Sequence, residues 1–353
     1  METDEIEFLE RLIDTPSPSG YEADVLGVWL DRVEGAADEV ETDSYGNTRA
    51  TLNPEGELDV VVAGHADEIG MMTNHVTDDG YLRVKRVGGL DAGVGRARRV
   101  VVHGDDGALP GVTGRKPVHL QDEDEDSEAE AKDIYVDLGM ESREQVMEAG
   151  VRVGSPITYE VGLQRLAGDV VAGRGIDNRV GVWVAAEVLR LVKDEDLDVT
   201  LHAVATVQEE LGLRGARMTG YSLDPDVALA VDVTFATDVP DVDEDEHGSV
   251  AVGDGPTLKH GKENHPVVVE GLRRTAENQG LDVQDEAIMT RGATDGDAFY
   301  VSRGGVPTAS IGLPNRYMHT PAEVVSLDDL EGCRDLLASY VADLDSGVSY
   351  SVL

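Results

Sequence analysis

Four apolar runs, alternating with segments of helical periodicity, constrain the fold of this 353-residue chain most strongly. Runs of this kind are typical of strands that are buried on both faces of a parallel sheet. They occupy residues 58–63, 199–207, 227–233 and 306–311. The helical segments around them occupy residues 4–14, 20–34, 180–192, 266–279 and 327–344. The alternation predicts an α/β fold with a mostly parallel sheet flanked by helices.

A segment from about residue 72 to 163 interrupts this pattern. It is rich in glycine and valine and shows short alternating stretches without the pattern of a long helix. It therefore predicts a small β-rich domain inserted into the α/β domain, which divides the chain into residues 1–71, 72–163 and 164–353. The acidic residues 121–132 predict a mobile, solvated loop, and residues 241–246 predict a second acidic loop.

Two single residues carry local expectations. Ser19 stands before the second helical segment and is a plausible helix cap. Cys333 is the only cysteine, which excludes an intrachain disulfide and a cysteine metal cluster. Because it falls in a helical pattern, we expect Cys333 to be a small core residue.

The charge of the chain excludes several partners. With 71 acidic and 29 basic residues, the formal net charge is -42, which would repel the phosphates of a nucleic acid. Abundant acids with few lysines predict adaptation to high salt, where screening shortens to about 3 Å at 1 M. No apolar stretch approaches the ~18 residues that span a bilayer, so we expect no membrane association. The acidic N-terminus lacks a signal-peptide pattern, so we expect a cytoplasmic protein.

Five short segments bearing histidines and carboxylates follow one another along the chain, most of them at the ends of apolar runs. They are Gly64–Gly70, Gly175–Asn178, Gln208–Glu210, Val231–Val233 and Met318–Thr320. In open α/β sheets, sites gather at the carboxyl ends of the strands. Two histidines with several Asp and Glu residues at such an edge can build a hydrolytic site with two metal ions.

His65 and Asp67 follow the first apolar run, and strand alternation would put both side chains on one side of the chain. A metal-bound imidazole needs its second nitrogen oriented, usually by a carboxylate, which Asp67 could supply. Alternatively, His65 packs at a strand end and Asp67 lies in a solvated turn.

Asp177 follows two glycines and precedes a helix, so it could bridge two cations or simply act as the helix N-cap.

Glu209 and Glu210 stand where the second apolar run ends, and ionised carboxylates are costly to bury unpaired. One could bind a metal while the other acts as a general base, or both could begin a solvated loop.

Asp232 lies inside an apolar run, where a cation is the simplest partner for its charge. His319 precedes residues 320–323, which resemble a capping box with proline at N1, so the alternative is a surface histidine before a helical turn.

In combination, these motifs make the chain resemble the tetrahedral aminopeptidases, co-catalytic metallopeptidases related to the glutamyl aminopeptidases. The resemblance covers nearly the whole chain. It rests on the motifs Gly64–Gly70, Gly114–His119, Asp133–Gly139, Gly175–Arg179, Val207–Gly212 and Arg316–Thr320. The Gly-Thr-Asp-Ala stretch of the family is altered at residues 292–298, which concerns substrate contacts and no metal ligand.

The resemblance implies two divalent metal ions per subunit. Asp177 would bridge them, His65 and Asp232 would complete one metal site, and Glu210 and His319 would complete the other. Two imidazoles among carboxylate oxygens suit Zn, Co or Mn better than Ca or thiolate-bound metals.

The resemblance also implies roles and an architecture. Glu209 would act as general base and proton shuttle, and Asp67 would orient His65. The α/β peptidase domain would be interrupted by a β-barrel-like dimerisation domain, and dimers would assemble into a tetrahedral homododecamer. The acid- and arginine-rich composition indicates a halophilic archaeal version.

The motifs therefore predict a metallo-aminopeptidase that removes N-terminal residues from short peptide substrates. A related two-metal amidohydrolase, such as a deacylase or a carboxypeptidase, is compatible with the metal motifs alone. A non-catalytic assembly is the alternative of a different class. The presence of both Glu209 and Glu210 argues against it, because an inactive shell needs no base.

Overall fold

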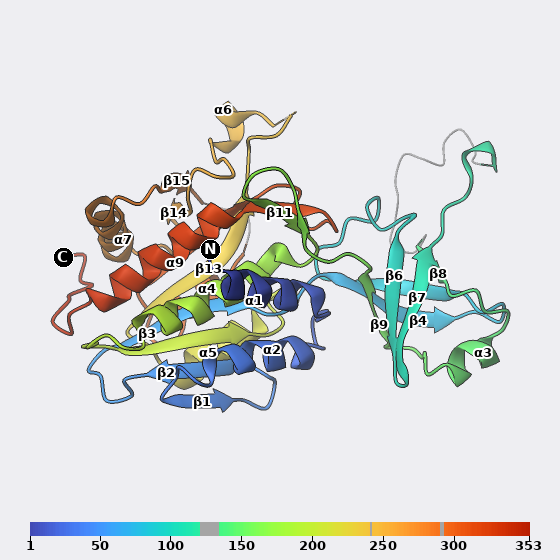
Figure 1. The fold of residues 1–353 in the computed structure, drawn as a ribbon, viewed down its shortest axis with the longest axis horizontal. Helices are drawn as coiled ribbons and strands as arrows, with labels where there is room; N and C mark the ends of the chain where they lie inside the picture. The colour runs from blue at the N-terminus through green and yellow to red at the C-terminus, as the bar shows by residue number, and fades with distance from the viewer. Residues whose placement is uncertain (121–133, 241, 290–292) are drawn as a thin grey trace.

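The computed structural model describes residues 1–120, 134–240, 242–289 and 293–353. The chain forms an α/β domain with a β-barrel beside it at one end of the molecule (Figure 1). An eight-stranded sheet in the order β1-β2-β12-β3-β13-β16-β14-β15 forms the centre of the α/β domain. The acidic loop predicted at residues 121–132 lies outside the described residues.

The four predicted apolar runs form four neighbouring parallel strands, as the sequence predicts. These strands are β12 (Thr200–Thr206), β3 (Asp59–His65), β13 (Val227–Phe235) and β16 (Thr308–Asn315). The outer strands are β1 (Glu39–Thr42), β2 (Thr48–Leu52), β14 (Thr257–His260) and β15 (Gln284–Ala287). β2 is antiparallel to β12, and β14 is antiparallel to β16, so antiparallel pairs border the parallel core.

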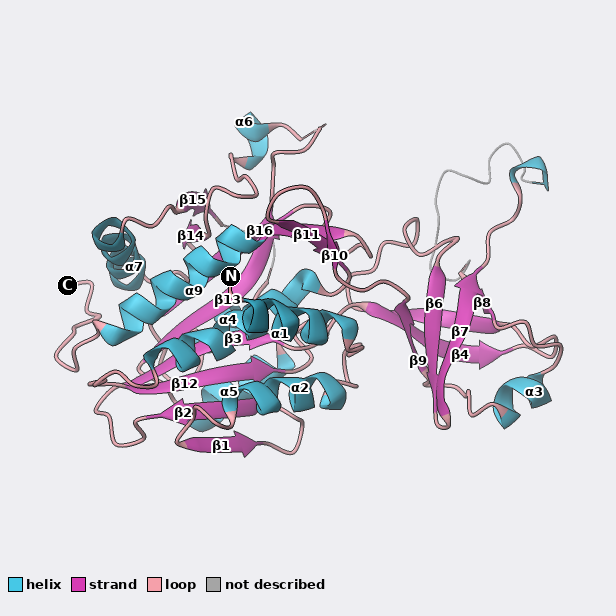
Figure 2. Cartoon of the chain, in the orientation of Figure 1, coloured by secondary structure: helices cyan, strands magenta, loops and turns pink. Residues whose placement is uncertain are grey.

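Helices cover both faces of this sheet, and β3 sends its side chains alternately into two cores (Figure 2). Val60 and Val62 belong to the larger core, and Val61 and Ala63 belong to the smaller one. The larger core is covered by α1 (Thr3–Asp14), α2 (Ala23–Val33), α4 (Ile176–Val192), α7 (Pro266–Gln279) and α9 (Leu327–Ala342). The smaller core is covered by α5 (Arg214–Leu223) and α8 (Asp295–Phe299). Cys333 is fully buried on α9, which confirms its predicted core position.

Two local predictions and one alternative interpretation are wrong. Ser19 does not cap α2, because that helix begins at Ala23 with Glu22 at the N-cap. Residues 320–323 do not open a helix, since Glu323 begins β17 (Glu323–Ser326). Residue 241 of the predicted acidic loop lies outside the described residues, and the rest is not simply a loop. α6 (Glu244–His247) starts within it, and the Asp243 side chain accepts a hydrogen bond from the backbone of its first turn.

The insert forms a closed six-stranded barrel in the order β4-β5-β8-β7-β6-β9, which confirms the predicted β-barrel-like architecture. Its strands are β4 (Gly70–Val76), β5 (Leu82–Val87), β6 (Arg99–Gly104), β7 (Gly107–Thr113), β8 (Tyr135–Asp137) and β9 (Pro156–Tyr159). The short elements η1 (Val118–Leu120) and α3 (Arg143–Glu148) lie between them in the sequence. The barrel has its own core, which includes Leu82, Val102 and Ile157.

A small sheet carries the chain back from the barrel to the α/β domain. β11 (Val170–Gly173) pairs with β10 (Gln164–Arg165) on one side and with β17 on the other. β17 is the strand that directly follows the predicted His319 segment, so this sheet lies next to the candidate site. None of the helices in the described ranges has the length and apolar content that a membrane crossing requires.

Candidate metal centre

The five predicted metal ligands and the predicted base meet at the carboxyl edge of the central strands and line one cleft of about 320 Å³. His65 ends β3, Glu209 and Glu210 follow β12, Asp232 lies in β13, Asp177 lies at the start of α4 and His319 follows β16. The cleft also contains side chains that the sequence did not single out, among them Phe235, Lys259 and Ile288. Residues from widely separated parts of the chain therefore line the same cleft.

Two glycines explain how α4 comes so close to β3. A Cβ on Gly64 would lie 2.4 Å from the backbone of Gly181, so any side chain there would push the helix away. The start of α4 is not helical, because Asp177 has φ -74° and ψ 100°, and its peptide bond to Asn178 is cis. The N-cap position belongs to Gly175. Asp177 is therefore not the helix cap that the alternative interpretation requires.

Asp177 lies between the two histidines of the site. Its Oδ1 is 3.2 Å from Nε2 of His65, and its Oδ2 is 3.3 Å from Nε2 of His319. Each imidazole nitrogen also faces a second acid: His65 lies 3.7 Å from Asp232, and His319 lies 3.5 Å from Glu210. One carboxylate thus presents one oxygen to each of two imidazole–carboxylate pairs.

Potential ligand atoms form two groups in which all atoms lie within 4.8 Å of one another. One group is His65, Glu209 and Asp232, and the other is Asp177, Glu210 and His319. Glu209, which the sequence predicts as a base, has its Oε2 4.0 Å from Nε2 of His65. The structure therefore brings together all five predicted ligands and the predicted base.

The electrostatics of this cluster fit divalent cations. Burial raises the pKa of Glu209 to about 10, although the charge of His65 opposes the shift. Burial raises the pKa of Glu210 to about 7, and the neighbouring Asp177 adds to the effect. A hydrogen bond with Asp177 raises the pKa of His319 to about 9. Carboxylates this crowded hold protons unless a positive charge is bound among them. Two imidazoles among carboxylates are a donor set that suits divalent cations.

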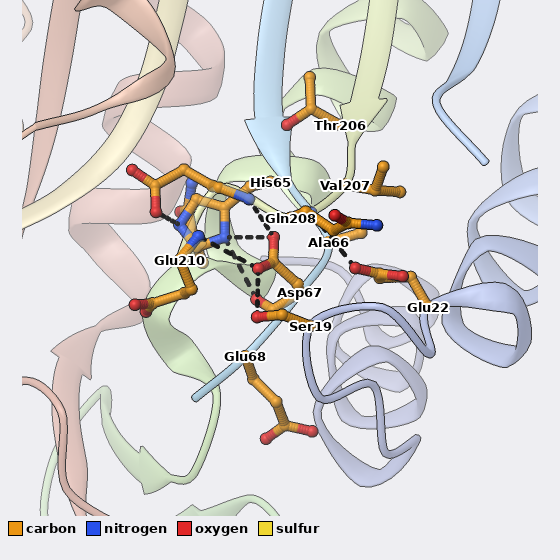
Figure 3. Close-up of polar contacts among 12 residues, drawn as sticks. Ser19, Glu22, His65, Ala66, Asp67, Glu68, Thr206, Val207, Gln208 and Glu210 are labelled. Carbon is orange, nitrogen blue, oxygen red and sulfur yellow. Dashed lines mark hydrogen bonds and ion pairs between the residues drawn. The ribbon is translucent and has the colours of Figure 1, made fainter. Parts of the chain in front are cut away.

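Asp67 organises the predicted base and the predicted metal ligand that follow β12. Its carboxylate accepts hydrogen bonds from the backbone nitrogens of Glu209 at 2.9 Å and Glu210 at 3.2 Å. It also accepts one from the hydroxyl of Ser19 at 2.7 Å, and Figure 3 shows Asp67 between Ser19 and His65. Nδ1 of His65 lies 3.2 Å from the carbonyl oxygen of Asp67 and 3.4 Å from its carboxylate. Asp67 is therefore placed to orient the imidazole as well as the acidic loop.

Glu323 is a buried residue of the site that sequence reasoning missed. Its carboxylate accepts hydrogen bonds from the backbone nitrogens of Asp177 at 3.0 Å and His319 at 2.9 Å. Burial raises its pKa well above the usual range. In the sequence, Glu323 resembled the last residue of a capping box. Its position four residues after His319 was the only sequence signal that could have indicated a role in the site.

A loop of the barrel closes the other side of His319. A Cβ on Gly89 would lie 2.6 Å from the imidazole ring, and one on Gly88 would lie 2.9 Å from Oε2 of Glu210. Gly88 has a φ of 70°, which an L side chain rarely adopts. The two glycines therefore let the barrel backbone approach the site, and the sequence pattern gave no sign of this contact.

Known proteins are similar to this chain in sequence and in architecture. The profile of the M42 glutamyl aminopeptidase family matches residues 46–336. A lysyl aminopeptidase from Pyrococcus furiosus is 32% identical over 343 residues, covering 96% of this chain and 97% of that protein. A TET aminopeptidase from Thaumarchaeota archaeon SCGC AB-539-E09 has a TM-score of 0.92 at 32% identity and covers 97% of both chains.

A further relative is described by its assembly. The TET1 peptidase of Pyrococcus horikoshii, which can assemble into a tetrahedron or a large octahedral shell, has a TM-score of 0.86 at 30% identity. The match covers 96% of this chain and 100% of that one. These matches extend over the α/β domain and the barrel alike. The chain therefore belongs to the M42 glutamyl aminopeptidase family and is a peptide hydrolase of the aminopeptidase class.

Proposed function

We propose that this enzyme uses two divalent metal ions to remove N-terminal residues from short peptides. The observation that carries the proposal is the position of Asp177, whose two carboxylate oxygens lie 3.2 Å and 3.3 Å from the nitrogens of two different histidines. A carboxylate with one oxygen directed to each of two ligand groups is suited to bridging two cations.

The residues present would hold the metals in two linked sites. His65 and Asp232 would hold one ion, Glu210 and His319 would hold the other, and Asp177 would contact both. Imidazole and carboxylate donors favour Zn, Co or Mn. Bound ions of this kind supply Lewis-acid activation of water and of the peptide carbonyl.

Glu209 is the proposed general base and proton shuttle. It is buried beside the proposed ligands, and the hydrogen bond from its backbone nitrogen to Asp67 holds its backbone in place. Its Oε2 lies 4.0 Å from His65, so it borders the metal ligands without replacing one of the five. From there Glu209 would take a proton from the attacking water and pass it to the leaving amine.

The barrel is the proposed dimerisation domain, and the subunits are proposed to form a tetrahedral homododecamer in the cytoplasm. The barrel adds neither a ligand nor the base, and a symmetric partner surface is a sensible use for it. The assembly described for the Pyrococcus horikoshii relative supports this proposal. An enclosed chamber would admit short unfolded peptides and exclude folded proteins, and light scattering in high salt measures the size of the assembly.

The test compares aminoacyl anilides with their N-acetylated forms in molar salt, with metal content measured on the same samples. An aminopeptidase cleaves the free amines, fails on the acetylated forms, and loses activity when a chelator removes the metals. Preference for the acetylated forms would instead indicate a deacylase. Release of C-terminal residues from longer peptides would indicate a carboxypeptidase, and metal binding without any hydrolysis would indicate a non-catalytic assembly.

A further inference from the structure

The loop that carries His319 is held in a strained backbone conformation. Tyr317 has a φ of 63° and His319 has a φ of 61°, in the left-handed region that residues other than glycine rarely adopt. Two such residues close together persist only where the surrounding structure holds them in place. The direction of the His319 imidazole therefore depends on contacts that anchor this loop.

Backbone hydrogen bonds hold the two ends of the loop together. The nitrogen of Arg316 donates to the carbonyl oxygen of Val324 at 3.0 Å, and the nitrogen of Val324 donates to the carbonyl oxygen of Arg316 at 3.0 Å. Nearer the imidazole, the nitrogen of His319 donates to Glu323 at 2.9 Å. The side chain of Tyr317 is 54% exposed, so it contributes little to holding the first part of the loop.

The side chain of Arg316 supplies an anchor for that first part. Its Nε donates to Oδ1 of Asp238 at 2.8 Å, and its Nη2 donates to Oδ2 of the same carboxylate. Two parallel hydrogen bonds between a guanidinium and a carboxylate fix orientation as well as distance. The side chains of Arg316 and Asp238 are 27% and 21% exposed, so the pair is largely shielded from water. The hydrogen bonds from Arg316 hold the pKa of Asp238 below its usual value.

Asp238 is a firm partner because the segment around it is fixed. The nitrogen of Thr237 donates to the carbonyl oxygen of Val250 at 2.7 Å, and the nitrogen of Val250 donates to the hydroxyl of Thr237 at 2.8 Å. The nitrogen of Val252 donates to the carboxylate of Asp238 itself at 3.2 Å. Asp238 follows β13, the strand that carries Asp232, so Arg316 ties the loop after β16 to the end of a neighbouring central strand.

Arg316 is placed to act on the site through this loop. It is not among the described residues that line the cleft, whereas Met318 and His319 are. Nε2 of His319 lies 3.3 Å from Asp177 and 3.5 Å from Glu210, so a rotation of the loop would change both distances. The contacts of Arg316 with Asp238 oppose such a rotation.

We propose that Arg316 is a positioning residue, whose paired hydrogen bonds with Asp238 keep the strained loop in the conformation that directs His319 to its metal. The inference rests on the proposed two-metal function and adds a residue that holds no metal and contacts no substrate. Loss of contacts that orient a metal ligand typically weakens metal binding by about 10- to 100-fold. The two groups of potential ligands are the His319 group (Asp177, Glu210 and His319) and the His65 group (His65, Glu209 and Asp232). The loss should be confined to the His319 group.

Isothermal titration of Zn²⁺ into the metal-free full chain tests one ligand group at a time. His65→Ala leaves only the His319 group with its histidine, and His319→Ala leaves only the His65 group with its histidine. Adding Arg316→Met should raise the Kd for Zn²⁺ by about tenfold or more in the His65→Ala background and leave it unchanged in the His319→Ala background. Arg273→Met is the matched control, because Arg273 on α7 also pairs with an aspartate and is 28% exposed. It should change neither Kd.

A double-mutant cycle tests the partner. In the His65→Ala background, Asp238→Asn should raise the Kd about as much as Arg316→Met does. The two substitutions together should raise it no further, because each alone removes the same pair. Arg316→Lys retains the charge without the planar fork and should lie between the wild-type residue and Arg316→Met.

Hydrogen exchange measures the loop in the absence of metal. Backbone exchange at residues 316–323 should become faster in Arg316→Met and stay at the wild-type rate in Arg273→Met. Circular dichroism and light scattering establish that each variant retains the fold and the assembly.

Turnover separates positioning from contact with substrate. When Zn²⁺ is raised well above the Kd of each variant, Arg316→Met should regain most of the wild-type kcat with an unchanged KM. A residue that binds substrate would instead raise KM at every concentration of Zn²⁺.

Several results would overturn the assignment. They are an unchanged Kd for Arg316→Met in the His65→Ala background, an equal increase in both histidine backgrounds, and additive effects in the double-mutant cycle. A raised KM at saturating Zn²⁺ would place Arg316 in contact with substrate. If the wild type binds no divalent ion, the proposed function fails, and hydrogen exchange at residues 316–323 still decides whether Arg316 holds the loop.

Discussion

Asp67 accepts a hydrogen bond at 2.9 Å from the backbone nitrogen of Glu209, although the two residues lie 142 positions apart in the sequence. The loop after β12 is thereby attached to the loop after β3. The same carboxylate lies 3.4 Å from Nδ1 of His65. One buried acid thus connects the proposed base with a proposed metal ligand, and the position of each depends on it.

Asp67→Ala should therefore impair metal binding and turnover together. The backbone nitrogens of Glu209 and Glu210 would lose their acceptor, and each buried unsatisfied donor costs about 1–3 kcal/mol. Ser19→Ala removes only the hydroxyl that donates to Asp67, so it should cost about 1 kcal/mol and keep both metals. Denaturation and metal analysis of both variants make the comparison. Equal effects of the two substitutions would contradict the connecting role of Asp67.

Glu209→Gln should keep two metals per subunit and lose turnover by ~10²-fold or more, the usual scale of general acid–base catalysis. The amide retains the size of the side chain but cannot accept the proton. Glu7→Gln on the exposed side of α1 is the matched control and should have wild-type turnover. Full metal content with near-normal turnover in Glu209→Gln would show that another group is the base.

Asp177→Ala should lower the occupancy of both metal sites, because each histidine of the site faces one oxygen of this carboxylate. Loss of a single independent ligand would instead empty one site and leave the other filled. Elemental analysis of the folded variant at increasing metal concentrations distinguishes these results. Asp196→Ala, at an exposed position after α4, controls for the loss of one acid.

Much of the candidate site could be predicted because its proposed ligands are residue types that are unusual at their positions in the sequence. An acid inside an apolar run, such as Asp232, needs a partner for its charge, and a histidine that ends such a run, such as His65, lies at the edge of the sheet where sites gather. Glu323, Ser19 and Gly89 escaped prediction for the opposite reason. Each of them either forms a hydrogen bond with a residue far away in the sequence or leaves space for such a residue. Interactions of this kind leave no periodic pattern in the sequence.

The fold was predictable to the same degree. Long apolar runs identified the central strands, and strong periodicity identified α7, whose bounds match the predicted ones. The short helices α5 and α8 were missed, because α5 contains two glycines and α8 has only five residues. The capping-box pattern at 320–323 misled because strand pairing between β17 and β11 outweighs a local helix signal.

Acid should weaken the protein through Glu68, which points away from the histidine cluster (Figure 3). Its carboxylate lies 2.5 Å from Arg174 and 3.2 Å from Arg179. Burial raises the pKa of Glu68, but the two arginines outweigh it, so the folded-state pKa lies below the usual 4.5. The unfolded chain therefore binds the proton more readily. The stabilisation is present above the unfolded pKa and is lost as pH falls through the folded one.

Glu68→Gln tests this sign. At neutral pH the variant should lose about 3 kcal/mol of unfolding free energy, because two buried arginines lose their counter-charge. As pH falls from the unfolded-state pKa through the lower folded-state pKa, the difference from wild type should shrink, because first the unfolded chain and then the folded carboxylate take up a proton. Chemical denaturation across this range measures it. A difference that stays constant with pH would mean that Glu68 is not ionised in the folded protein.

Removal of salt should dissociate or inactivate the enzyme. Each subunit carries a formal charge of -42, so subunits brought together in an assembly repel one another. Desalting lengthens the screening distance from about 3 Å at 1 M to about 30 Å at 0.01 M, which lets this repulsion act across whole interfaces. The particle size from light scattering and the rate of anilide hydrolysis, followed together during dialysis, should fall over the same salt range.

A matched series in a non-ionic osmolyte separates charge screening from exclusion effects, because the osmolyte favours burial without shielding charge. Unchanged size and activity at low salt would show that these acids are spaced widely enough to need no screening, and the prediction of a halophilic protein would then be wrong.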